Sequence, residues 1–285
     1  MPLLSILAII FVLMCFLFAV VTYLLYWYEH QSQIDMLFES RNDAALATKS
    51  GILSAFKAQV VCISILPFGA LVQLLQRNRP ALPDTQAQSV IMVHGLFHNT
   101  SAWIFYKYWF RKQGIKNCAS FYYSSRKTFE SVTAEFDIYM NAVLAQNPQA
   151  KPVLIGHSLG GLLLRNWLAQ SENAKKVAGA ITLGAPMQGS KLAIFSATNL
   201  GKQLDFNGSL IKQIEACEQQ KSFSPIPCYA FFSPVDNMVL PQKSVATPPP
   251  HWVTIKTKPV SHLAMLSDKD IAIEVANLLN TLFKK

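Results

Sequence analysis

A Gly-x-Ser-x-Gly stretch, Gly156-His157-Ser158-Leu159-Gly160, stands between two apolar runs. The first run reads as a strand and the second as a helix. A serine in such a turn is typical of a nucleophile, because small residues allow a tight turn that presents the hydroxyl above the strand end. The alternative is a glycine-rich packing corner with a spectator serine. The spacing predicts that Ser158 is catalytic if the chain also supplies a base and an acid.

Two histidines follow Ser158 in the chain, His251 and His262. His251 comes directly after three prolines and before an apolar run, so we expect it to begin a strand. His262 lies between that strand and an amphipathic carboxyl-terminal segment, in a loop at a strand's carboxyl end. In strand–turn–helix serine sites of this kind the chain order is serine, acid, histidine. We therefore predict His262 as the base.

Asp236 is the predicted acid. It lies three residues past the apolar run 227–233, at another expected strand end, where it would orient His262 and stabilise the imidazolium. Other acids fit less well, because they lie in an insert or begin the last helix, where they favour the helix dipole: Asp205, Glu215, Asp268 and Asp270.

The oxyanion of a tetrahedral intermediate needs aimed N–H donors. The amide of Leu159, next to the nucleophile, is one predicted donor. The second is expected from the loop after the apolar run 89–93, with the amide of Leu96 preferred and that of Phe97 as the alternative.

Two histidines in that loop, His94 and His98, are four residues apart. They lack the intervening carboxylate of an HExxH zinc helix. We predict no metal site, and the acyl-transfer chemistry needs no cofactor.

The elements that would position these residues alternate from about residue 88. Short apolar runs next to segments of helical spacing predict a mostly parallel sheet covered on both faces. Strands are expected at 89–93, 118–123, 152–156, 177–184, 227–233 and 251–257. Helices are expected at 131–146, 159–170 and 270–283.

Several motifs in this order resemble the α/β-hydrolase fold, specifically bacterial serine lipases and esterases. The matching pieces are His94-Gly95, the GHSLGG of 156–161, the LGAP of 183–186 with Gly189-Ser190, the aspartate of SPVDNMVLP and the histidine of SHLAML. The resemblance covers residues 88–285 and implies a lid or cap insert, here 190–224. Only a short linker precedes the first strand, so we expect a minimal sheet of about six strands.

The amino-terminal third has a different composition. Residues 3–28 contain no charge and would form a helix of about 39 Å, longer than a ~30 Å hydrocarbon core. The tyrosines and the tryptophan at its end suit the head-group level, and the segment lacks the basic start and small-residue site of a cleaved signal peptide. We expect a transmembrane anchor over 1–30, in a bacterial inner membrane; a soluble core helix is the alternative.

A connecting region, 31–87, contains a second apolar stretch at 58–75, interrupted by Pro67. This stretch is short for a span, and three alternatives stay open: a second span, an interfacial or re-entrant segment, or a helix packed on the domain. Residues 76–89 read as a linker. The side of the membrane that the domain faces, and the oligomeric state, stay open as well.

The composition fits a membrane segment joined to a globular domain, with 51% hydrophobic and 14% charged residues. The net charge of +9 indicates a solvated basic surface or attraction to anionic lipids, and no nucleic-acid-binding signature accompanies it. Cys217 and Cys228 are either bridged or free.

Together these features predict a membrane-anchored serine hydrolase of carboxylic esters, with lipid esters suggested by the anchor, the apolar insert and the basic charge. An acyltransferase or a thioesterase would use the same triad. A non-catalytic membrane-bound binding protein is the alternative from another class.

Overall fold

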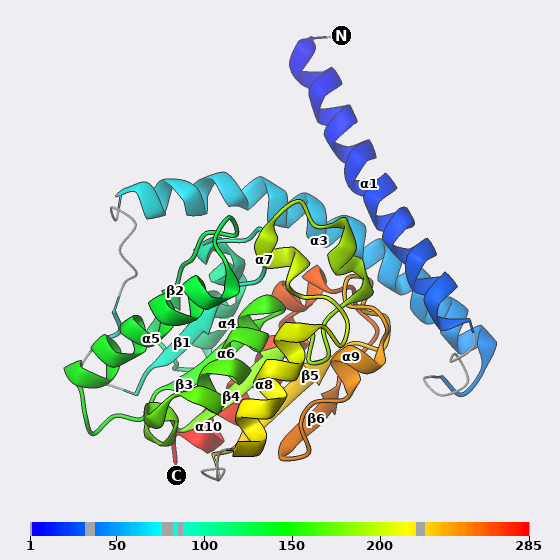
Figure 1. The fold of residues 1–285 in the computed structure, drawn as a ribbon. Helices are drawn as coiled ribbons and strands as arrows, with labels where there is room; N and C mark the ends of the chain where they lie inside the picture. The colour runs from blue at the N-terminus through cyan, green and yellow to red at the C-terminus, as the bar shows by residue number, and fades with distance from the viewer. Residues whose placement is uncertain (1, 32–37, 76–81, 85–87, 221–225, 285) are drawn as a thin grey trace.

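The computed structural model of the chain describes residues 2–31, 38–75, 82–84, 88–220 and 226–284. Two long helices precede an α/β domain, and the first of them projects away from it (Figure 1). Most of the predicted linker at 76–89 lies outside the described residues. All five cysteines are free, so Cys217 and Cys228 are not bridged.

A single parallel sheet forms the centre of the domain, with the strand order β2-β1-β3-β4-β5-β6. Its inner strands are continuous apolar runs because helices cover both faces. The strands are β1 (Val90–Val93), β2 (Cys118–Phe121), β3 (Val153–His157), β4 (Gly179–Leu183), β5 (Cys228–Phe232) and β6 (Trp252–Lys256). Each lies within two residues of its predicted bounds, which confirms the minimal six-stranded fold.

Alternate side chains of the strands enter two cores, one on each face of the sheet. Helices α5 (Phe129–Gln146), α6 (Leu159–Gln170) and α8 (Ser209–Gln220) cover one face. Helices α4 (Ile104–Lys112) and α10 (Lys269–Leu282) cover the other. The helices predicted at 131–146, 159–170 and 270–283 are thereby confirmed.

Short helices complete the domain: η1 (Thr100–Trp103), η2 (Glu172–Lys176), η3 (Lys191–Phe195), α7 (Asn199–Lys202), α9 (Lys243–Ala246) and η4 (Leu263–Leu266). The predicted lid insert, 190–224, contains η3, α7 and α8, and its last four residues lie outside the described residues.

A buried ion pair connects helix α8 of the insert to α6. Arg165 Nη2 lies 2.6 Å from Glu218 Oε2, with the two side chains 4% and 11% exposed.

Glu218→Gln would leave the guanidinium charge buried without its partner, so we expect the free energy of unfolding to fall by about 3 kcal/mol. Urea unfolding measures this change. Glu135→Gln is the matched control, because the Lys127–Glu135 pair is 40% and 38% exposed and should contribute below about 1 kcal/mol. Equal losses would contradict the prediction.

Helix α3 (Arg41–Leu75) is longer than the sequence predicts. It begins 17 residues before the apolar stretch 58–75 and runs through Pro67, so this stretch is the carboxyl-terminal part of a longer helix. Its inner face packs on the domain: the Asn99 side chain donates to the Leu66 carbonyl at 2.9 Å, and the Ser261 amide donates to Ser54 Oγ at 2.8 Å. Beyond residue 57, α3 contacts the domain through the Leu66 carbonyl.

Helix α1 (Leu3–His30) has two parts. Residues 3–18 are mostly exposed and apolar, whereas the part from Ala19 to His30 packs against α3 and the domain. Both α1 and α3 are long and apolar enough to cross a membrane by length and composition. Tyr23 and Tyr26, expected at the head-group level, are instead buried, each 2% exposed.

Candidate active site

Ser158 occupies the turn between β3 and α6, with φ 53° and ψ −124°. Few non-glycine residues adopt a positive φ, and such strain is concentrated at functional sites. The two flanking glycines are needed for close approach, because a Cβ on Gly156 would lie 2.5 Å from the Gly161 nitrogen and one on Gly160 would lie 2.2 Å from the Val93 oxygen. Ser158 therefore stands in a strained, tightly packed turn between a strand and a helix.

Asp236 and His262 are in direct contact. His262 Nδ1 donates to Asp236 Oδ2 at 2.7 Å, and the two side chains are 3% and 0% exposed. The other carboxylate oxygen, Oδ1, accepts from the amides of Met238 at 2.9 Å and Val239 at 3.0 Å. These donors compensate a buried carboxylate and fix its plane, so one oxygen remains aimed at the imidazole.

All three predicted residues lie at the carboxyl edge of the sheet, after β3, β5 and β6. The Ser158 amide donates to Leu183 O at 2.9 Å, which ties the elbow to the end of β4. Among the described residues no hydrogen bond joins the Ser158 hydroxyl to the His262 ring. Catalytic contacts of this kind often tighten only when substrate binds. His251 precedes β6, as predicted.

The two predicted oxyanion donors lie close to Ser158. Leu159 follows Ser158 and begins α6. Leu96 follows Gly95, and Gly95 is so close to Ser158 that a Cβ added to Gly95 would lie 3.0 Å from Ser158 Cβ. The Phe97 amide, the alternative donor, already donates to Ser125 Oγ at 2.8 Å. This engagement favours Leu96 as the second donor.

Three other histidines surround His262. Burial lowers the pKa of His94 to about 3 and that of His98 to about 4, and it holds the pKa of His157 well below its usual range. His157 Nε2 donates to the His262 carbonyl at 3.2 Å, and the His94 ring stacks on Tyr123. At neutral pH these rings are uncharged. His157 therefore contacts His262 without placing a positive charge beside it.

Gly184 lies directly against the Asp236–His262 pair. A Cβ there would lie 3.1 Å from Asp236 Oδ2 and 3.1 Å from His262 Nδ1. We expect Gly184→Ala to displace the pair by a few tenths of an ångström and to lower kcat about 10-fold. Gly114→Ala is the matched control, because Gly114 also has a positive φ but nothing lies within 4 Å of its Cβ position. Kinetics and unfolding of both variants test this: equal losses of activity would contradict it.

Two residues near the site escaped prediction from the sequence. Asn237 Oδ1 accepts from the His262 amide at 3.1 Å, and the Asn237 side chain donates to Thr22 Oγ1 at 2.7 Å. Thr22 lies on α1, more than 200 residues away in the chain. The available signal was the i, i+4, i+8 spacing of Thr22, Tyr26 and His30 in an otherwise apolar helix, which marks one helix face.

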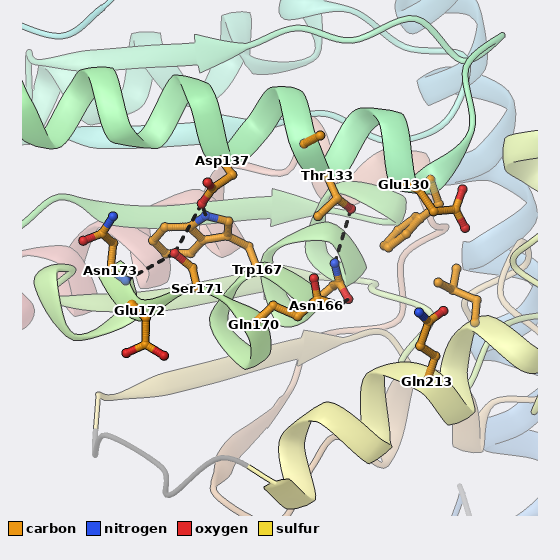
Figure 2. A pocket seen from close by; sticks show the side chains of 13 residues that line it. Glu130, Thr133, Asp137, Asn166, Trp167, Gln170, Ser171, Glu172, Asn173 and Gln213 are labelled. Atoms are coloured by element: carbon orange, nitrogen blue, oxygen red, sulfur yellow. Dashed lines mark hydrogen bonds between the residues drawn. The ribbon is translucent and has the colours of Figure 1, made fainter.

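A pocket of about 570 Å³ lies on the flank of the domain between α5, α6 and α8 (Figure 2). In Figure 2 Asp137 and Trp167 point toward each other, and Trp167 Nε1 donates to Asp137 Oδ1 at 2.8 Å. Asn166 and Trp167 lie at least about 12 Å along α6 from Ser158. No predicted site residue lines this pocket, so it is separate from the candidate active site.

Comparisons with known proteins point to one fold. A family model described as alpha/beta hydrolase fold matches residues 88–207, and no curated protein sequence matches the chain. The mature lipase BlEst2 of Bacillus licheniformis is 17% identical with a TM-score of 0.55, over 70% of this chain and 94% of that one. Aspergillus fumigatus lipase B is 14% identical with a TM-score of 0.55, over 67% of this chain and 53% of that one.

Phospholipase PlaB of Legionella pneumophila is 18% identical with a TM-score of 0.46, over 52% of this chain. The chain spans 39% of the length of that phospholipase. At 17% and 14% identity, the two lipases share the fold alone with this chain. The family match over residues 88–207, the six-stranded parallel sheet and the serine turn after β3 show that the domain has the α/β-hydrolase fold.

Proposed function

We propose that the protein is a membrane-anchored serine hydrolase that cleaves carboxylic esters, and that its substrates are lipid esters. The observation that carries the proposal is the arrangement at one edge of the sheet. Ser158 stands in a strained turn, and at the same edge His262 donates to the buried Asp236. Nucleophilic acyl transfer requires this combination of nucleophile, base and orienting acid.

In the proposed reaction Ser158 Oγ attacks the ester carbonyl while His262 Nε2 takes its proton. Asp236 stabilises the resulting imidazolium through the Nδ1–H, and the amides of Leu96 and Leu159 donate to the oxyanion. The imidazolium then protonates the leaving alcohol, and the carbonyl re-forms as an acyl-enzyme. Water attacks that ester with His262 again as base, which releases the carboxylic acid and restores Ser158.

Exposed apolar side chains support a membrane location. The projecting part of α1, 3–18, is mostly exposed. The carboxyl-terminal half of α3 exposes a second apolar set: Ile63, Phe68, Leu71, Val72, Leu74 and Leu75. Since this half of α3 lies along the domain while α1 projects from it (Figure 1), α1 would insert into the bilayer and α3 would lie at its surface.

Apolar side chains near the candidate site support lipid substrates. Phe97 is exposed beside the predicted oxyanion loop, and Ile194 and Phe195 of the insert are exposed as well. Exposed aromatic and aliphatic groups of this kind contact acyl chains or the bilayer interface favourably.

The test is hydrolysis by the full-length protein of phospholipid vesicles, acylglycerol emulsions and short soluble esters, with Ser158→Ala in parallel. We expect fatty-acid release from lipids that is lost in Ser158→Ala. Turnover of short soluble esters alone would refute the lipid substrate. Transfer to an added alcohol, or a preference for thioesters, would point instead to an acyltransferase or a thioesterase.

A further inference from the structure

We infer that α1 is a part of the active site as well as an anchor: its polar face positions the loop that carries Asp236. This loop, 233–242, follows β5. The inference rests on the proposed function, since it assigns a role around the proposed catalytic acid. The polar face consists of Thr22, Tyr23, Tyr26 and His30, and all four side chains are buried.

Two tyrosines hold the backbone immediately before the acid. Tyr23 donates through its hydroxyl to the Val235 carbonyl at 2.8 Å, and Tyr26 donates to the Pro234 carbonyl at 2.7 Å. Val235 is the neighbour of Asp236 in the chain and is itself fully buried. Because the loop carries no helix or strand between β5 and α9, contacts such as these determine where the carboxylate stands.

Thr22 holds the residue after the acid. Asn237 donates to Thr22 Oγ1 at 2.7 Å and accepts from the His262 amide at 3.1 Å. A connected pair of hydrogen bonds therefore runs from α1 through the acid loop to the backbone of the predicted base. Both partners of the Asp236–His262 contact are held from the same helix.

The end of α1 holds the far side of the loop and the start of the insert. His30 Nε2 accepts from the Gln242 amide at 2.7 Å, and its Nδ1 donates to the Tyr26 carbonyl at 2.7 Å. Glu29 pairs with Lys191 of the insert at 2.5 Å. The helix thus contacts both ends of the acid loop, and loss of these contacts would free Asp236 to shift relative to His262.

The experiment compares Tyr23→Phe/Tyr26→Phe with wild type in the full-length, detergent-solubilised protein on a soluble short-chain ester. This substrate removes any effect of membrane attachment. We expect kcat to fall about 10-fold with KM unchanged, because a misplacement well below 1 Å costs less than the ~10²-fold of a full ångström. A looser Asp236–His262 contact stabilises the imidazolium less, so the acidic limb of the kcat/KM profile should move to lower pH.

Tyr28→Phe is the matched control, since Tyr28 is on the same helix but 81% exposed. Wild-type kcat and an unshifted pH profile in the double variant would overturn the inference. Should the double variant not fold, Thr22→Val and Thr22→Ser decide the matter: loss in the first with retention in the second supports the inference, and equal activity overturns it. Failure of the proposed function has a different signature, namely a wild-type protein that neither turns over esters nor reacts with a fluorophosphonate.

Discussion

Ser158→Ala is expected to lower kcat for ester hydrolysis by about 10⁵-fold, because the loss of the nucleophile removes the entire covalent route. The remaining rate would come from substrate binding and the oxyanion donors alone. The substitution removes one oxygen from a half-buried side chain in a turn whose tight packing depends on Gly156 and Gly160. The fold should therefore persist.

Two measurements check this expectation in the same preparations. Steady-state hydrolysis reports the rate, and labelling by a fluorophosphonate probe reports the nucleophile itself. Wild type should be labelled and Ser158→Ala should not. Ser131→Ala, at an exposed position in α5, is the matched serine control and should keep both activities. Undiminished labelling of Ser158→Ala would mean that another residue is the nucleophile, and the proposed function would fall.

The sheet, and the placement of Ser158, Asp236 and His262 at its carboxyl edge, could be predicted because short local sequence patterns indicate each of them. Buried parallel strands are unbroken apolar runs, so six short runs predicted six strands. Ser158 is marked by its glycines, and Asp236 and His262 follow from chain order and strand ends. The Asp236–His262 contact at 2.7 Å is the geometric consequence of parallel strands that end at one edge.

The docking of α1 was not predictable in the same way. Tyr23 and Val235 are 212 residues apart, and no local pattern pairs them. A tyrosine side chain is favourable at the head-group level of a bilayer, and it is equally favourable in a buried site that offers its hydroxyl one hydrogen-bond acceptor. The residue type alone therefore does not distinguish these two environments. The amino-terminal part of α3 was missed for a different reason. Its buried positions follow a helical period, but they are small or polar residues that do not stand out as an apolar stretch: Ala44, Ala47, Thr48, Gly51 and Ala55.

Asp236→Asn is expected to lower kcat by about 10⁴-fold with the fold intact. The hydrogen bonds around the carboxylate explain why so small a change should matter. Oδ1 accepts from the amides of Met238 and Val239. Only an oxygen atom can accept these two hydrogen bonds, because an NH₂ group is a donor. The asparagine must therefore keep its oxygen there and turn its NH₂ group toward His262 Nδ1.

That orientation would reverse the hydrogen bond to the base. An NH₂ group donates, so the His262 ring would present an unprotonated Nδ1 and carry its proton on Nε2. A ring in this tautomer cannot accept the Ser158 proton, although every heavy atom remains in place. Loss of the negative charge also removes the stabilisation of the imidazolium.

The measurement is kcat on a soluble ester for Asp236→Asn and for Asp270→Asn, with unfolding of both. Asp270 is the matched control, because its exposed side chain pairs with Lys258 at the start of α10. Asp270→Asn should leave kcat unchanged. A large loss in Asp236→Asn with unaltered stability would show that Asp236 acts on the tautomer and charge of His262 rather than on the integrity of the fold. Retention of more than about a tenth of the activity, far above the ~10⁻⁴ expected, would show that another group orients His262.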